Sequence, residues 1–171
     1  MRIFLIGFMG SGKSTLGKKL ALKLGYQFLD MDKVVEANIH MSIAEHFEKF
    51  GEDSFRLAES KVLKTTELPE NCVIATGGGA PCFFDNLEWM NANGTTIYLA
   101  LPAKALAKRL ESATGQRPVL QNLKGEALEQ FISEKLESRD KFYIQADIIL
   151  SGQNQTTEKL IEILKSKGYL K

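Results

Sequence analysis

The residues with the clearest chemical potential lie within the first fifteen positions of the chain. Positions 7–14 read Gly-Phe-Met-Gly-Ser-Gly-Lys-Ser, which satisfies the pattern G-x-x-x-x-G-K-[ST]. Glycines let backbone N–H groups approach a polyphosphate closely. Lys13 would carry a positive charge to the terminal phosphates, and the Ser14 hydroxyl is a ligand that Mg²⁺ accepts. The pattern therefore predicts a loop that binds the phosphates of a nucleotide.

The residues on either side favour the strand and the helix that such a loop needs. Positions 3–6 are a short apolar run of β-formers, and Leu16, Leu20 and Leu24 recur at helical spacing. A helix beginning at the loop points the partial positive charge of its N-terminus at the phosphates. The alternative is a simple glycine turn before a helix, which the flanking elements make the weaker interpretation.

A pair of carboxylates, Asp30 and Asp32, follows the next strand-like run at 26–29. Alternate residues at the end of a strand point to the same side, and open α/β sheets bind ligands at the carboxyl ends of their strands. We expect Asp30 to be the acidic partner that the metal of a phosphate-binding loop requires. The alternative is an N-cap for the helix that begins near Lys33, and one aspartate can serve both purposes.

Three consecutive glycines, Gly77–Gly79, follow an apolar strand-like run at 72–75. Such a run is costly in chain entropy and is expected where a ligand presses on the backbone, although a wide turn would also use it. Upstream, Arg56 and Glu59 stand three positions apart on a predicted helix. Their spacing alone predicts an exposed ion pair that contributes little to the stability of the helix.

A long segment at positions 111–122 lacks the hydrophobic periodicity of a helix or a strand. Positions 111–122 contain one arginine, Arg117, followed by Pro118. A loop of this length inside a compact domain is either functional or disordered. An arginine on a mobile loop over a phosphate site can close on the transferring group. We therefore predict a mobile lid at about 112–122.

The order of apolar runs and helical patterns predicts an α/β fold. Strand-like runs lie at 3–6, 26–29, 72–75, 95–99 and 147–150, with helical patterns between them and at the end of the chain. One of these helices opens with a capping box at Ser42 and breaks near Gly51, and another is expected from Phe83 to Asn93. The alternation predicts a single three-layer domain over 1–171, with a five-stranded parallel sheet covered by helices on both faces.

The composition narrows the class of protein. A chain of 171 residues with 44% hydrophobic and 25% charged residues is typical of one globular domain. The net charge of +1 argues against electrostatic binding to nucleic acid or membranes, and no run approaches the ~20 apolar residues of a membrane span. Cys72 and Cys82 form no C-x-x-C motif, which favours a reduced, cytoplasmic protein. His40 and His46 fit no metal site and are expected at the surface or in caps.

Three features favour a small-molecule kinase over a regulatory GTPase or a motor. The chain is short, and it lacks a guanine-reading N/T-K-x-D motif. It also lacks a strand of four apolar residues ending in Asp after the glycine loop, since the candidate at 72–75 runs into Thr76 and glycines. Three arginines at loops and helix ends, Arg56, Arg117 and Arg139, would suit a small anionic acceptor, because guanidinium forks bind carboxylates bidentately.

On these motifs the chain resembles the shikimate kinases over its whole length. The matches are the segment 7–15, Asp30-Met31-Asp32, Phe55-Arg56 with Glu59, Gly77-Gly78-Gly79-Ala80, the loop with Arg117, Pro118 and Leu120, and Arg139 with Tyr143. The resemblance implies transfer of the γ-phosphate of ATP to the 3-hydroxyl of shikimate, in aromatic amino-acid biosynthesis. It also implies the strand order 2-3-1-4-5, one Mg²⁺ per subunit and a monomer.

The resemblance further implies a role for each matched residue. Catalysis falls to Asp32, Lys13 and Arg117. Shikimate is expected to bind within about 32–60 and beyond, at Asp32, Arg56, Glu59, Gly77, Gly78, Gly79 and Arg139. ATP is expected to bind at Gly10, Ser11, Gly12, Lys13, Ser14, Thr15, Arg109, Arg117 and Gln155. The metal is expected to bind near Ser14 and Asp30.

One region departs from the family pattern. Many members carry an Asp-containing segment leading to a Pro where adenine lies, whereas Leu150–Thr156 contains neither residue. Backbone atoms can still hold adenine, and Arg109 is either a residue that stacks on it or an exposed helix charge. The competing functions are another small-molecule kinase, for gluconate or a nucleoside, and a nucleotide-binding module without catalysis.

Overall fold

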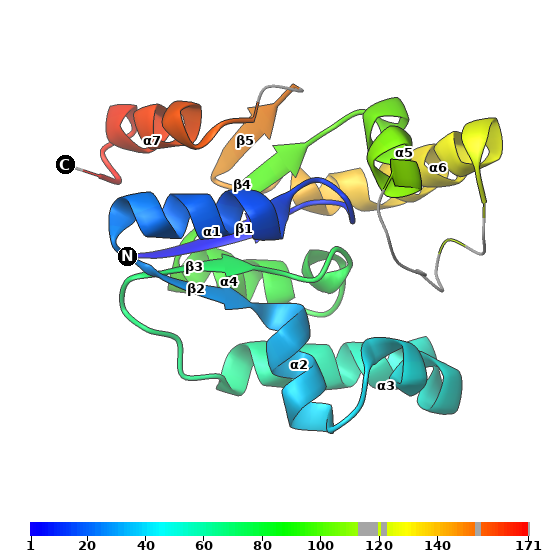
Figure 1. Cartoon of the computed structure of the whole chain (residues 1–171). Helices are drawn as coiled ribbons and strands as arrows, with labels where there is room; N and C mark the ends of the chain where they lie inside the picture. Colours follow the sequence, from blue (N-terminus) through cyan, green and yellow to red (C-terminus); the bar gives the residue numbers. More distant parts are fainter. Residues whose placement is uncertain (113–119, 121–122, 153–154, 171) are drawn as a thin grey trace.

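Five parallel strands form the centre of the computed structural model, which describes residues 1–112, 120, 123–152 and 155–170 (Figure 1). The strands are β1 (Arg2–Ile6), β2 (Gln27–Asp30), β3 (Cys72–Ala75), β4 (Thr95–Ala100) and β5 (Ile148–Ser151). Their order in the sheet is β2-β3-β1-β4-β5, and every neighbouring pair is parallel. The predicted strand order is confirmed, and each predicted strand lies within one residue of the observed one at either end.

Helices cover both faces of this sheet. They are α1 (Lys13–Leu24), α2 (Met31–Ile39), α3 (Ile43–Thr65), the 3₁₀ turn η1 (Ala80–Cys82), α4 (Asn86–Asn93), α5 (Ala103–Ser112), α6 (Gly125–Tyr143) and α7 (Thr157–Ser166). Side chains of β1 alternate between the faces: Ile3 and Leu5 pack with α1 and α7, while Phe4 and Ile6 pack with α2, α3 and α4. This confirms the three-layer α/β domain.

Local signals explain where several helices begin, bend and end. Ser42 and Glu45 form the predicted capping box at the start of α3. Gly51, with φ 78°, interrupts the same helix where a break was predicted. The helix predicted from Phe83 instead begins at Asn86, because Phe84 has φ 53° and cannot continue a right-handed helix. The error lies at a backbone conformation that the sequence does not signal.

Helices α5 and α6 lie together beyond the carboxyl ends of the strands (Figure 1). They pack around Phe8 of the glycine loop, and Leu120 is buried in the same cluster. Apart from Ser112 and Leu120, the predicted lid at 112–122 lies outside the described residues, and so does Arg117. Within the described ranges, no helix is both long and apolar enough to cross a membrane.

Candidate active site

The loop between β1 and α1 has the conformation that its glycines predict. Gly10 and Gly12 have φ of 79° and 98°, and Gly12 caps the N-terminus of α1. The Lys13 ammonium donates hydrogen bonds to the carbonyl oxygens of Gly7 at 2.7 Å and Phe8 at 2.9 Å. Its positive charge is therefore held against the loop that would receive the phosphates.

Ser14 and Asp30 meet at the carboxyl edge of the sheet. The Ser14 hydroxyl donates to Asp30 Oδ2 at 2.9 Å, and Asp30 Oδ1 accepts from the backbone N–H of Asp32 at 3.2 Å. Asp30 is thus the N-cap of α2, as one interpretation predicts, and its second carboxylate oxygen lies beside Ser14. Its role as the partner of a metal stays a prediction. Asp32 lies in the first turn of α2 rather than at the end of the strand.

A cavity of about 340 Å³ joins these groups. Its lining includes Lys13, Ser14, Asp30, Asp32 and Gly78. Asp32 remains accessible to solvent here, but protein atoms crowd its carboxylate, and this burial raises the pKa of Asp32 above its ordinary value. Asp30 raises the pKa further, whereas Lys13 and Arg56 oppose the shift. The Asp32 carboxylate therefore accepts a proton more readily than an exposed aspartate does.

The pair formed by Arg56 and Glu59 is buried, which corrects the expectation of an exposed surface pair. The Arg56 Nη1 group donates to Glu59 Oε2 at 2.8 Å, and the side chains are only 9% and 5% exposed. The guanidinium carbon lies 4.5 Å from the ring centroid of Phe83. Burial raises the pKa of Glu59 even though Arg56 opposes the rise. Helical spacing shows that two residues are neighbours, but not which way their side of the helix faces.

The three consecutive glycines make room for these charged side chains. A Cβ on Gly77 would collide with Glu59, and one on Gly79 would lie 2.6 Å from Arg56 Nη2. A Cβ on Gly78 would lie 3.2 Å from the backbone nitrogen of Met9. The groups that approach the glycine run are the protein's own: charged side chains at Gly77 and Gly79, and backbone atoms of the phosphate-binding loop at Gly78. That a ligand also presses on this backbone stays a prediction.

Arg139 of α6 faces the same region from the opposite side. Its guanidinium lies over the ring of Phe8, with its central carbon 5.4 Å from the centroid. Its Nη1 is buried and has no hydrogen-bond partner among the described residues. One turn along α6, the Tyr143 hydroxyl donates to the carbonyl oxygen of Gly78 at 2.6 Å. A buried guanidinium nitrogen without an acceptor is a site where an anion can bind.

A second cavity, of about 500 Å³, brings the predicted acceptor residues together. Asp32, Arg56, Glu59, Gly77–Gly79 and Arg139 all line it. Sequence reasoning missed Glu52, Phe83 and Lys135. Glu52 and Lys135 line this cavity as well, while Phe83 stacks on Arg56. Glu52 and Lys135 had a signal in the sequence, because each stands four positions before a predicted site residue, Arg56 or Arg139, on the same helix.

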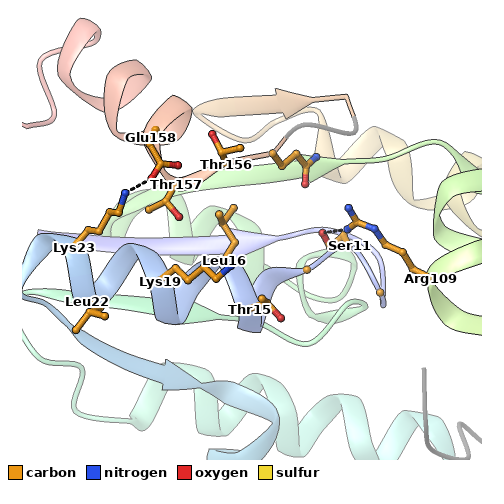
Figure 2. A pocket seen from close by; sticks show the side chains of 13 residues that line it. Ser11, Thr15, Leu16, Lys19, Leu22, Lys23, Arg109, Thr156, Thr157 and Glu158 are labelled. Atoms are coloured by element: carbon orange, nitrogen blue, oxygen red, sulfur yellow. Dashed lines mark hydrogen bonds and ion pairs between the residues drawn. The ribbon is translucent and has the colours of Figure 1, made fainter. Parts of the chain in front are cut away.

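A third cavity, of about 640 Å³, lies on the other side of the glycine loop. Figure 2 shows Arg109 directed at Ser11, and Arg109 Nη1 donates to the Ser11 carbonyl at 3.1 Å. Thr15 and Gln155 also line this cavity. The Gln155 amide nitrogen donates to the carbonyl oxygens of Ala100 and Leu150, at 3.0 and 2.8 Å. The side chain of Gln155 thereby links the ends of β4 and β5.

The two histidines differ in their surroundings: His40 is exposed, whereas His46 is buried. His40 ends α2 with φ 54°, as a capping residue does. His46 is buried between Phe50 and Phe55, so its predicted surface position is wrong. The described residues contain no cluster of three or more His, Cys, Asp or Glu side chains that could hold a metal by themselves.

Comparison with known proteins gives a consistent result. The family model described as shikimate kinase matches residues 9–167. A shikimate kinase from Parabacteroides distasonis is 46% identical over 92% of this chain and 91% of its own length. One from Aquifex aeolicus is 40% identical over 97% of this chain and 95% of its own.

Solved structures agree with the sequence relatives. A shikimate kinase from Bacteroides thetaiotaomicron has a TM-score of 0.89 and 41% identity, with 99% of both chains covered. A shikimate kinase from Acinetobacter baumannii, solved in complex with shikimate, has a TM-score of 0.88 and 33% identity, covering 99% of this chain and 95% of its own. A deoxyadenosine kinase from M. mycoides, at 20% identity and a TM-score of 0.61, shares the fold alone.

Proposed function

The chain belongs to the shikimate kinase family and transfers phosphate from ATP to a hydroxyl of shikimate, and we propose how its residues divide this reaction. The observation that carries the proposal is the position of Asp32. Asp32 lines both the cavity beside the phosphate-binding loop and the cavity that contains the two arginines. A base at this junction can contact an acceptor hydroxyl that faces the terminal phosphate.

On the donor side, the glycine loop and α1 hold the phosphates of ATP. Backbone N–H groups at the N-terminus of α1 face the phosphates. Lys13 exchanges its carbonyl partners on Gly7 and Phe8 for phosphate oxygens. The adenine of ATP would lie in the third cavity. Arg109, Thr15 and Gln155 support this placement, because they line that cavity together.

Mg²⁺ fits the residues at the edge of the sheet. The ion usually keeps several waters and binds through one or two carboxylates together with the phosphates of the substrate. The contact between the Ser14 hydroxyl and Asp30 offers one oxygen ligand and one carboxylate for such a site. When bound, Mg²⁺ neutralises charge on the phosphates. Ser14 would bind the ion, and Asp30 would orient Ser14 and the waters of the ion.

On the acceptor side, Arg139 and Arg56 bind the carboxylate of shikimate. The unpartnered Nη1 of Arg139 supports this role, because an anion would satisfy it. Glu59 holds Arg56 in place through its buried ion pair. Gly77–Gly79 form the wall of the cavity without side chains that would intrude.

In the transfer step, the 3-hydroxyl of shikimate gives its proton to the Asp32 carboxylate as its oxygen attacks the γ-phosphorus. A new O–P bond forms, the bond between the γ-phosphorus and the bridging oxygen breaks, and ADP leaves. Lys13 stabilises charge on the transferring group, where electrostatics and positioning provide most of the catalysis. We assign Arg117 the same task on the basis of the resemblance, although it lies outside the described residues.

A coupled assay that detects ADP tests the function directly. Mg-ATP with shikimate should give turnover, whereas gluconate and nucleosides should give none. Turnover with gluconate or a nucleoside alone would instead assign the chain to another small-molecule kinase. Nucleotide binding without transfer to any of these acceptors would favour the non-catalytic module.

The pH dependence of kcat/KM should reflect the ionisation of the Asp32 carboxyl group. The carboxylate must be deprotonated to accept the hydroxyl proton, so activity falls as the pH drops through the pKa of Asp32. Because burial raises this pKa, the fall should occur at a pH above the ordinary value of 3.8. A pH–rate profile, with ¹³C NMR titration of the Asp32 carboxyl in the free enzyme, makes the measurement. A carboxyl titrating at or below 3.8 would contradict this assignment.

Gly79→Ala should disturb the acceptor site selectively. The added Cβ would lie within 2.6–2.7 Å of the Arg56 guanidinium and force it to move. We expect the KM for shikimate to rise about tenfold, as when one charge-assisted hydrogen bond is lost. The KM for ATP should stay within a factor of about two. Steady-state kinetics with a thermal melt measures both effects, and an unchanged shikimate KM in a folded variant would show that Arg56 does not need this space.

We further propose that the enzyme is a cytoplasmic monomer that binds neither nucleic acid nor membranes. The net charge of +1 supports the absence of binding to nucleic acid and membranes, and the free thiols of Cys72 and Cys82 support the cytoplasmic location. Size-exclusion chromatography with light scattering would measure the mass of the protein in solution, and the mass of a dimer would contradict the proposed monomer.

A further inference from the structure

Glu52 is an exposed carboxylate that binds the acceptor-site arginine. Its Oε1 accepts hydrogen bonds from Arg56 Nε at 3.2 Å and from Arg56 Nη2 at 3.0 Å. Glu59 holds Nη1 of the same guanidinium. The two partners differ in burial, since the Glu52 side chain is 52% exposed and that of Glu59 is 5% exposed. Arg56 therefore has one fixed, buried partner and one partner at the open side of the cavity.

Glu52 occupies an edge of Arg56 that a substrate carboxylate could use. A guanidinium receives a carboxylate bidentately along an edge, and the pair of Nε and Nη2 forms one such edge. The backbone of Gly79 and the ring of Phe83 lie against the guanidinium, which restricts approach by other routes. An acidic ligand that binds Arg56 therefore competes with Glu52.

The charges of the cavity lead to the same conclusion. Three carboxylates and three cationic side chains line it: Asp32, Glu52, Glu59, Arg56, Lys135 and Arg139. While all six are charged, an anion gains little net attraction from them. When Glu52 moves away from Arg56, the remaining lining favours an anion. Of the two carboxylates that bind Arg56, Glu52 is the more readily released, because its side chain is exposed and water can replace its contacts.

The local backbone also permits this release. Glu52 directly follows Gly51, where α3 is interrupted with φ 78° and ψ 175°. It is thus the first residue of the second half of α3, near a helix N-terminus that stabilises a carboxylate even without an ion pair.

We propose that Glu52 is a placeholder carboxylate, which binds Arg56 until the carboxylate of shikimate displaces it. Glu52 thereby sets the affinity for the acceptor by acting through Arg56. The inference rests on the proposed role of Arg56 in binding shikimate. It predicts that removing a negative charge from this cavity strengthens the binding of an acid beyond the wild-type level.

Glu52→Gln tests the proposal, because it keeps the shape of the side chain and a neutral acceptor while removing the charge. At low ionic strength, the KM and the Kd for shikimate should fall about two- to fivefold, the range that corresponds to an exposed ion pair. The kcat and the KM for ATP should not change. As a matched control, Glu48→Gln removes an exposed charge from the preceding turn of α3 and should leave all constants unchanged.

A second acceptor separates charge competition from other effects. Shikimate with its carboxylate reduced to a hydroxymethyl group should bind Glu52→Gln and wild type equally. A shikimate Kd that is unchanged or raised in Glu52→Gln would overturn the proposal, as would an equal gain for both acceptors. If wild type binds shikimate without phosphorylating it, the proposed function fails while the Kd comparison still decides the role of Glu52. Wild type that does not bind shikimate would overturn both.

Discussion

Asp32→Asn is expected to lower kcat by about 10²–10⁴-fold, the range that a general base contributes. Asparagine has nearly the same shape and can still hydrogen-bond a ring hydroxyl, but it cannot accept the proton of the attacking hydroxyl. The KM values for shikimate and ATP should therefore change by only a few-fold. Steady-state kinetics with saturating Mg-ATP measures this split between kcat and KM.

Two comparisons make the Asp32→Asn result specific. Asp53→Asn makes the same chemical change at an exposed position of α3 and should behave as wild type. A thermal melt of the Asp32→Asn protein should show that the fold persists. Turnover at the wild-type rate in a folded Asp32→Asn protein would remove Asp32 as the base.

Arg139→Ala is expected to raise the KM for shikimate by about 10–150-fold, which corresponds to one charge-assisted contact of about 1.5–3 kcal/mol. The contact should form with Nη1, which is buried and lacks a partner within the described part of the chain. ATP binding should be nearly unaffected, because Arg139 does not line either cavity beside the phosphate-binding loop.

Arg139→Lys refines this prediction, because it keeps the charge and removes the planar fork. We expect its KM for shikimate to lie between those of wild type and Arg139→Ala. Lys141→Ala removes an exposed cation from the same helix and serves as the control. Direct titration of shikimate into each variant gives the affinities, and an Arg139→Ala protein with the wild-type affinity would place the substrate carboxylate elsewhere.

The parts of the molecule that the sequence predicted best are those set by local interactions. The glycine loop, the cap at Ser42 and the break at Gly51 depend on neighbours in the chain, and all three are present. The order of the strands was obtained from the family resemblance. Spacing alone would have left several parallel arrangements open.

The parts that the sequence predicted poorly depend on which side of a helix faces the protein. Arg56 and Glu59 had the spacing of a surface pair, yet they are buried against the glycine run. His46 was expected at the surface or in a cap because it fits no metal or nucleophile constellation, yet it is buried against two phenylalanine rings. The need for glycine at positions 77 and 79 likewise comes from the charged side chains of Glu59 and Arg56 beside them. The contacts of Gly77 with Glu59 and of Gly79 with Arg56 join segments more than fifteen residues apart, and no local pattern encodes them.

The strand order places the proposed binding groups in a line. Going across the carboxyl edge of the sheet, Asp32 follows β2, Gly77–Gly79 follow β3, the phosphate-binding loop follows β1, Arg109 follows β4 and Gln155 follows β5. With about 4.8 Å between neighbouring strands, five strands span about 19 Å. The proposed sites for the acceptor, the phosphates and adenine would thus follow one another across the sheet, in the order of its strands. The phosphoryl group would then pass from donor to acceptor across the strands, at right angles to their direction.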